Sequence, residues 1–246
     1  MNFSDAMQRL KAKVILCDLD DTILHTNRIF TRQIELFCST VHAAIPSIPR
    51  FEIEAHVHRL SKELYSSESI KKSNWKKIAA ELVAIYGRSS EEVIENALGF
   101  MLNVYETVPD LRTGALEFLS EVKESQIPLA IITHGTEAWT DLKLSSHKLH
   151  FYIEQLHIVP ESEHKTERHW AQAIKALNVA PSEVIAIGDS ILTDMWPARK
   201  CGVNMLIWVD KPDGWNLYRQ GTLPVGAHAI KELTEVIPLI CRLPWN

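Results

Sequence analysis

Short apolar runs and longer amphipathic stretches alternate along the second half of the chain. From about residue 113 onward, each short run is followed by a stretch whose apolar positions recur with the three-four spacing of a helix. The pattern predicts strands at 14–17, 129–133, 156–159, 184–188 and 205–209, and helices near 113–125, 136–147, 166–177, 193–201 and 231–241. Such alternation is typical of a parallel sheet covered by helices on both faces. We therefore predict an α/β fold with a Rossmann-like, doubly wound parallel sheet in three layers.

Residues 25–107 follow a different pattern. Apolar residues recur at helical spacing, as at Phe30, Ile34, Phe37 and Val41, and no strand pattern interrupts them. A block of about 80 residues is too long for a loop and has its own apolar stripes, which indicates an inserted helical-bundle cap domain. The Rossmann-like core would then comprise residues 1–24 and 108–246. Since ligands of open parallel sheets bind beyond the carboxyl ends of the strands, this cap would cover the site.

Composition narrows the class of partner. The chain has 246 residues, 46% of them hydrophobic, and a net charge of −5, which makes binding to extended nucleic acid unlikely but leaves single nucleotides as ligands. The four cysteines are far apart in sequence and form no zinc or redox motif. No apolar run reaches signal-peptide or membrane-spanning length. We expect a cytoplasmic monomer or homodimer that has no membrane partner.

Clustered carboxylates follow the first predicted strand. The apolar run 14–17 leads directly into Asp18, Asp20, Asp21 and Thr22. Two carboxylates held this close repel each other, and a cation, a shared proton or water must compensate them. A divalent metal is one such cation. The alternative is that Asp20 or Asp21 only caps a helix or occupies a turn.

Other predicted strands end in chemically useful residues. The strand at 129–133 ends in Thr133, and His134 and Gly135 would form a turn with approachable N–H groups. Lys165 follows the strand at 156–159, where a solvated surface lysine is the ordinary interpretation. The strand at 184–188 leads into Asp189, and then into Asp194, which could instead cap the next helix. Together these positions offer carboxylate oxygens for a hard cation, and a hydroxyl and an ammonium group for phosphoryl oxygens.

The order of these residues resembles the four motifs of the haloacid dehalogenase-like (HAD) hydrolase superfamily. Asp18-Leu19-Asp20-Asp21-Thr22 matches the first motif, Thr133 the second and Lys165 the third. Gly188-Asp189-Ser190 with Asp194 matches the fourth. Many relatives have proline after the lysine, whereas Thr166 follows here. The helical insertion between the first two motifs is similar to that of phosphatase-type members with a helical cap.

The resemblance implies a Mg²⁺-dependent phosphatase that acts on a small phosphate monoester. Asp18 would be the nucleophile and form an aspartyl-phosphate, and Asp20 would be the general acid and base. The Asp18 carboxylate, the Asp20 backbone carbonyl and Asp189 would hold Mg²⁺, with Asp194 placing Lys165 or a metal-bound water. Thr133 and Lys165 would stabilise the phosphoryl oxygens, and His134 and Gly135 would contribute to substrate binding.

Several alternatives stay open at this point. A dehalogenase of the same superfamily needs no acid for a halide, so Asp20 favours a phosphatase. Sugar phosphomutases typically carry glycine where this chain has Asp21. A phosphoacceptor of the receiver type would carry its acceptor Asp on a later strand than the acidic pair and would be about half this length, and the intact Asp18, Asp20 and Asp189 disfavour a non-catalytic binding protein. The substrate could be a phosphometabolite or a nucleoside monophosphate, and the cap residues that would select it include Lys71, Lys72, Trp75, Lys76, Lys77 and Arg88.

Overall fold

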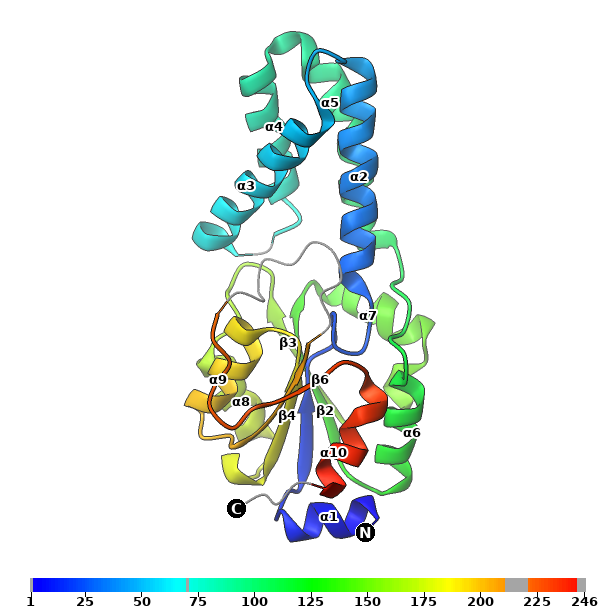
Figure 1. The fold of residues 1–246 in the computed structure, drawn as a ribbon, viewed down its shortest axis with the longest axis vertical. Helices are drawn as coiled ribbons and strands as arrows, with labels where there is room; N and C mark the ends of the chain where they lie inside the picture. The colour runs from blue at the N-terminus through cyan, green and yellow to red at the C-terminus, as the bar shows by residue number, and fades with distance from the viewer. Residues whose placement is uncertain (1, 70, 211–220, 243–246) are drawn as a thin grey trace.

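The fold consists of a parallel sheet with helices on both faces and a helical cap above one end of the sheet (Figure 1). The computed structural model describes residues 2–69, 71–210 and 221–242. In Figure 1 the cap forms the upper part of the molecule, and both described ends of the chain lie at the bottom of the core. The carboxyl ends of the strands therefore face the cap.

The sheet has six strands in the order β3-β2-β1-β4-β5-β6, and every neighbouring pair is parallel. The strands are β1 (Val14–Cys17), β2 (Leu129–Gly135), β3 (Gln155–Pro160), β4 (Val184–Gly188), β5 (Met205–Val209) and β6 (His228–Ile230). All of β1 is buried, and Cys17 is in register with Ile131 on one side and Ile187 on the other. The residue that follows β1, Asp18, therefore lies at the centre of the carboxyl edge.

Alternating side chains of the strands build two apolar layers. Ile15 and Cys17 belong to a cluster with α1 (Phe3–Arg9), α6 (Ala115–Glu124) and α10 (Val236–Arg242). Val14 and Leu16 belong to a second cluster with α8 (Glu167–Ala176) and α9 (Trp196–Lys200). Helix α7 (Glu137–Ser146) adds Leu144 to the first cluster. The predicted three-layer, doubly wound α/β fold is confirmed.

The cap is built from four helices. These are α2 (Thr26–Ala44), α3 (Arg50–Glu68), α4 (Asn74–Tyr86) and α5 (Glu91–Asn103), with the short 3-10 turns η1 (Arg88–Ser90) and η2 (Val104–Glu106). Their buried apolar residues form a cluster separate from the two clusters of the sheet, and Trp139 of α7 is the core residue that joins it. The predicted helical insertion after the first strand is therefore present.

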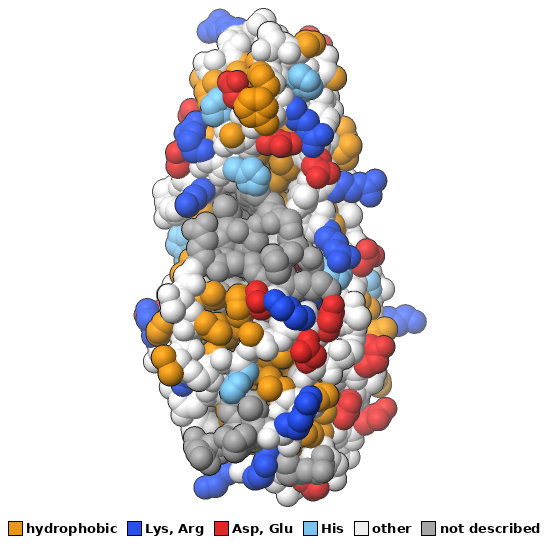
Figure 2. Space-filling view, in the orientation of Figure 1, with side chains coloured by type: hydrophobic (Ala, Val, Ile, Leu, Met, Phe, Trp, Pro, Cys, Tyr) orange, Lys and Arg blue, Asp and Glu red, His pale blue; other side chains and the backbone are white. Residues whose placement is uncertain are grey.

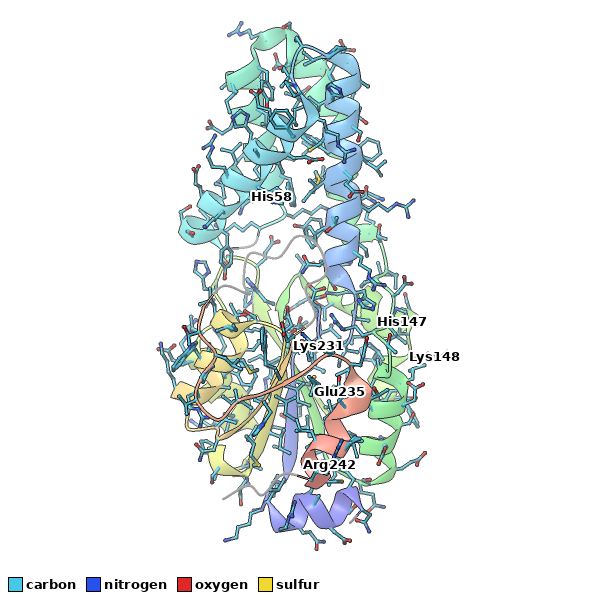
Figure 3. The ribbon with its side chains drawn as sticks, viewed as in Figure 1. His58, His147, Lys148, Lys231, Glu235 and Arg242 are labelled. Atoms are coloured by element: carbon cyan, nitrogen blue, oxygen red, sulfur yellow. The ribbon has the colours of Figure 1, made fainter. Side chains whose placement is uncertain are left out.

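Several elements differ from the prediction. The three-residue strand β6 and helix α1 were not predicted. The predicted helix at 193–201 is a π-helical turn, η5 (Ile191–Met195), followed by α9. Pro197 lies in the first turn of α9, where its missing N–H breaks no helical hydrogen bond. The predicted helix at 231–241 is the 3-10 turn η6 (Leu233–Glu235) and α10, with Glu235 Oε1 accepting from the Lys231 N–H at 2.8 Å (Figure 3).

Hydrogen bonds tie the cap to the core. The Ser69 hydroxyl, at the end of α3, donates to the Glu163 carbonyl at 2.7 Å. The Lys72 N–H donates to Glu161 Oε2 at 3.0 Å. The chain returns from the cap past Pro109, whose carbonyl accepts from His147 at the end of α7 at 2.7 Å (Figure 3). These bonds hold the return crossing and the α3–α4 connection against the core.

The visible surface is mixed in charge. Figure 2 shows Lys and Arg side chains interspersed with Asp and Glu on the cap and on the core. Within the described part of the chain, every helix is too short or too polar to cross a membrane. All four cysteines are free.

Candidate active site

Asp18 lies at the end of β1 and is 4% exposed. Its N–H donates to the Ile187 carbonyl at 2.9 Å, which extends the β1–β4 pairing by one bond. Its Oδ2 accepts from the Thr22 hydroxyl at 3.1 Å, and its Oδ1 accepts from Lys165 Nζ at 2.5 Å. Burial raises the pKa of Asp18 to about 7, although the charge of Lys165 opposes this rise. The Asp18 carboxylate is thus held in place by Thr22 and Lys165, but the charge of Lys165 does not fully offset the effect of burial on its pKa.

Lys165 bridges two carboxylates, that of Asp18 after β1 and that of Asp194 in η5. Its buried Nζ lies 2.5 Å from Asp18 Oδ1 and 2.6 Å from Asp194 Oδ1. The other Asp194 oxygen, Oδ2, accepts from the Ser190 N–H at 3.0 Å. Burial alone would lower the pKa of Lys165, but the two carboxylates raise it well above its usual value, so the ammonium form is retained. The sequence predicted this residue by resemblance alone, and its ordinary interpretation as a surface lysine is wrong.

Gly188 makes the close approach of Asp194 possible. A Cβ built on Gly188 would lie 2.6 Å from the Asp194 carboxylate, nearer than real Cβ contacts come. Any other residue at this position would displace Asp194 and, with it, its ion pair with Lys165. The glycine before Asp189 is therefore required by packing rather than by its backbone angles.

Three buried carboxylates converge at the carboxyl edge of the sheet. Asp18, Asp189 and Asp194 each offer an oxygen, and these atoms all lie within 4.8 Å of one another. Within the described residues, the Lys165 ammonium pairs with Asp18 and Asp194, and three carboxylates this close repel one another unless a cation lies among them. Oxygen donors of this kind suit Mg²⁺. The donor set therefore fits the metal that the sequence predicted.

The Asp20 carboxylate is held by three side chains outside this group. Lys143 Nζ donates to both of its oxygens, at 2.7 and 2.8 Å. The Thr26 hydroxyl donates to Oδ1 at 2.5 Å and the Thr133 hydroxyl to Oδ2 at 3.3 Å. Burial alone would raise the pKa of Asp20, but Lys143 and the two hydroxyls lower it. The environments of the two acids of the first motif therefore shift their pKa values in opposite directions, upward for Asp18 and downward for Asp20.

Lys143 is the site residue that the sequence analysis missed. Its side chain is fully buried on α7, with Nζ 4.1 Å from the centre of the Trp139 ring. A signal was present, because Lys143 is four positions after Trp139 and next to Leu144, on the stripe of α7 that is buried. A lysine on the apolar stripe of a helix that follows a motif strand indicates a buried charge with a partner.

Asp21 lies in the turn between β1 and the first cap helix, α2. Its φ is +58°, in the left-handed region, and its Oδ1 accepts from the Asn27 N–H at 2.8 Å. The buried Arg112 donates from Nη1 to the Asp21 carbonyl at 2.7 Å. Burial raises the pKa of Asp21 to about 8, against the Asn27 hydrogen bond. Asp21 thus connects both cap crossings.

The strand β2 is longer than predicted, so His134 and Gly135 lie within it rather than in a turn after it. His134 and Gly135 pair with Val159 and Pro160 of β3, so they belong to the strand, and the predicted glycine turn is wrong. The fully buried Thr133 and both of these residues face or border the catalytic edge. His134 Nε2 lies 3.3 Å from the Ser69 hydroxyl of the cap. Burial, followed by the charge of Lys165, lowers the pKa of His134 to about 4.

A cavity lies between this edge and the cap. The clustered carboxylates and Lys165 border it from the core, together with His134 and Gly135. Of the cap residues proposed to select the substrate, Lys71 and Trp75 line it. Lys77 instead pairs with Glu68 on the surface. The site is thus enclosed by both parts of the chain.

The parallel sheet, the cap inserted after β1 and the carboxylates at the strand ends define a class: capped, Rossmann-like α/β proteins with an acidic site at the carboxyl edge of the sheet. The family model described as haloacid dehalogenase-like hydrolase matches residues 15–208. The chain belongs to this family. A search of curated proteins gave no match.

Solved structures of the family share the fold at low sequence identity. A haloacid dehalogenase-like hydrolase from Xanthomonas campestris has a TM-score of 0.72 and 13% identity over 94% of this chain and 91% of that one. A HAD-hydrolase from Bacillus subtilis bound to magnesium has a TM-score of 0.64 and 16% identity, with 93% and 98% covered. A predicted phosphoglycolate phosphatase from Haemophilus somnus has a TM-score of 0.64 and 13% identity, with 93% and 98% covered. The similar structures also include dehalogenases, so these neighbours show the fold alone.

Proposed function

We propose that this chain is a Mg²⁺-dependent phosphatase that hydrolyses a small phosphate monoester. The observation that carries the proposal is the second carboxylate, Asp20, placed two residues after Asp18 and held by Lys143, Thr26 and Thr133. An alkoxide leaving group needs a proton, whereas a halide does not. A dehalogenase would have no use for an acid in this position.

The side chains support a reaction in two displacements. Asp18 would attack phosphorus, the bond to the leaving oxygen would break, and an aspartyl-phosphate would form. Lys143 holds Asp20 ionised in the free protein, so Asp20 would first take up a proton as the substrate binds, would give it to the leaving oxygen, and would then take one from the water that hydrolyses the intermediate. Lys165 and the Thr133 hydroxyl would stabilise the charge on the phosphoryl oxygens.

Magnesium fits the carboxylate cluster described above. Asp18 and Asp189 would hold the ion together with the Asp20 carbonyl, and the bound ion would reduce the repulsion between Asp18 and the phosphate dianion. We assign Asp194 to the positioning of Lys165, because its Oδ1 already lies 2.6 Å from Nζ. The magnesium in the similar Bacillus subtilis structure supports this part of the proposal.

The direct test measures orthophosphate release from a panel of phosphate monoesters with Mg²⁺ and with a chelator. We expect release that depends on Mg²⁺ and that Asp18→Asn abolishes. The exposed Asp141 on α7 provides a matched control, because Asp141→Asn removes a carboxylate far from any metal ligand. Halide release from 2-haloacids without phosphate release would favour the dehalogenase, and isomerisation of a hexose 1-phosphate would favour the phosphomutase.

A second test separates the roles of the two acids. Asp20→Asn is expected to reduce turnover of alkyl phosphates by about 10² to 10⁴, the usual contribution of a general acid or base. Aryl phosphates, whose leaving oxygen needs a proton less, are expected to lose less in the first step. Equal losses for both substrates in a single-turnover measurement would contradict the role given to Asp20.

A further inference from the structure

Aromatic side chains form the wall of the cavity that faces the catalytic carboxylates. Phe30, Trp75 and Tyr105 come from the cap, and Trp139 comes from α7 of the core. The centre of the Phe30 ring lies 6.3 Å from those of Trp75 and Tyr105 and 6.2 Å from that of Trp139. Four rings that meet at these separations form one continuous aromatic surface.

This aromatic wall begins at the group that would protonate the leaving oxygen. Lys143 lies against the Trp139 ring and contacts both oxygens of Asp20. Thr26, at the start of α2, also contacts Asp20 and places Phe30 one turn further along the same helix. The atoms attached to a leaving oxygen at Asp20 would therefore meet Trp139 first and then Phe30 and Trp75.

Two polar atoms on the cap side of the cavity have no hydrogen-bond partner within the described residues. They are Ser61 Oγ and Asn74 Oδ1, and both side chains are more than nine-tenths buried. The Asn74 amide Nδ2 donates to the Ser69 carbonyl at 2.9 Å, which fixes the amide so that Oδ1 is the acceptor left over. A buried acceptor without a donor is unfavourable until a ligand supplies one.

The chemistry of this wall favours some leaving groups over others. On the aromatic side of the cavity a polyol would find few polar partners, because Trp75 Nε1 already donates to the Tyr105 hydroxyl and Trp139 Nε1 to the Thr107 carbonyl. A carboxylate needs a cation, and the cavity's Lys71 already lies 3.5 Å from Glu68. A planar ring can stack on the aromatic wall, and a ring N–H can reach an acceptor such as Asn74 Oδ1.

Building on the proposed phosphatase function, we propose that the leaving group carries a nitrogen-containing aromatic ring, as the nucleoside of a nucleoside monophosphate does. The ring lies among Phe30, Trp75 and Trp139 and donates an N–H to Asn74 Oδ1. The phosphate remains at Asp18, and the leaving oxygen remains at Asp20.

The test compares nucleoside 5′-monophosphates with ribose 5-phosphate. Both are esters of the same primary alcohol, but ribose 5-phosphate has a hydroxyl in place of the base. We expect kcat/KM to be at least about tenfold higher for one or more of the nucleotides, since stacking of a base on an aromatic side chain has this magnitude. Acetyl phosphate serves as a substrate without a ring.

Matched variants test whether the aromatic wall causes the preference for a nucleotide. Trp75→Leu is expected to lower kcat/KM for the preferred nucleotide about tenfold relative to kcat/KM for acetyl phosphate. Tyr86→Leu on the same helix removes a cap ring that pairs with His56 and does not line the cavity, so it should change neither. If Trp75→Leu does not fold, Phe30→Leu provides the same comparison. Asn74→Leu should also reduce turnover of the nucleotide selectively.

The outcomes separate this inference from the proposed function. Equal kcat/KM for ribose 5-phosphate and every nucleotide, with clear phosphate release, would overturn the inference and leave the phosphatase proposal standing. A nucleotide preference that Trp75→Leu and Phe30→Leu both leave intact would also overturn it. The absence of phosphate release from every substrate, including acetyl phosphate, would overturn both.

Discussion

Lys143 offers the sharpest test of how the second acid is tuned. Its buried ammonium lies 2.7 and 2.8 Å from the two oxygens of Asp20. Lys143 itself belongs to none of the four motifs. Lys143→Met removes this charge and keeps an unbranched side chain against Trp139. Asp20 would keep the hydroxyls of Thr26 and Thr133 but lose the charge that opposes its burial.

The size of the effect follows from the geometry. An opposite charge at this distance lowers the pKa of a carboxyl group by about one to three units, which is about 1.4 to 4 kcal/mol in favour of the ionised form. Removing Lys143 therefore raises the pKa of Asp20 by a similar amount. Because Asp20 must be ionised to take a proton from water, the acid limb of the kcat profile should move to higher pH by about one to three units.

Acetyl phosphate is the substrate for this assay. Its leaving acetate needs no proton, so hydrolysis of the aspartyl-phosphate should limit turnover and the acid limb should report on Asp20. Lys143→Arg is expected to restore the parent profile in part, and Lys148→Met, at an exposed position after the same helix, is expected to leave it unchanged (Figure 3). A folded Lys143→Met variant with the parent's acid limb would refute the reasoning.

Two further predictions concern stability. Gly188→Ala places a Cβ 2.6 Å from the Asp194 carboxylate and should lower the free energy of unfolding by about 1 to 3 kcal/mol in denaturant titrations. Gly99→Ala in α5 is the control, because a Cβ there meets nothing within 4 Å, and it should not lower the free energy of unfolding. Equal stability of the two variants would contradict the packing argument. His134 has its pKa lowered from 6.5 to about 4, so the unfolded chain binds the extra proton between these values and stability falls as the pH drops through this window. The loss attributable to His134 is at most about 3 kcal/mol, and it should disappear in His134→Gln but persist in His150→Gln, which changes an exposed histidine. The same pH dependence in all three proteins would show that His134 is not its source.

The sequence predicted the elements whose patterns are local. The strands β1, β4 and β5 were predicted with their observed ends, because continuous apolar runs mark strands buried on both faces. The edge strand β6 was missed, since three residues of mixed burial carry no such pattern. The π-helical turn η5 was also missed, because it depends on Ser190, whose carbonyl accepts from both Asp194 and Met195.

Only the site residues that belong to a motif were predictable from the sequence. The positions of Asp18, Asp189 and Asp194 followed from strand ends that meet at one edge. The pairing of Lys165 with Asp18 joins residues 147 positions apart, and no local pattern predicts it. Lys143 was missed because it belongs to no motif, although its place on the buried stripe of α7 indicated a buried charge.

The position of β1 at the centre of the sheet has a consequence for synthesis on the ribosome. β1 lies between β2 and β4, so its first partner strand begins at residue 129 and its second at residue 184. The cap helices, whose buried apolar residues lie almost entirely between residues 34 and 104, are translated in between and can pack first. The nascent strand that carries Asp18 therefore stays accessible until late, and a ribosome-stalled chain ending before residue 129 should be cleaved by protease near β1 but resist cleavage within the cap. Protection of β1 in that nascent chain would contradict this order of assembly.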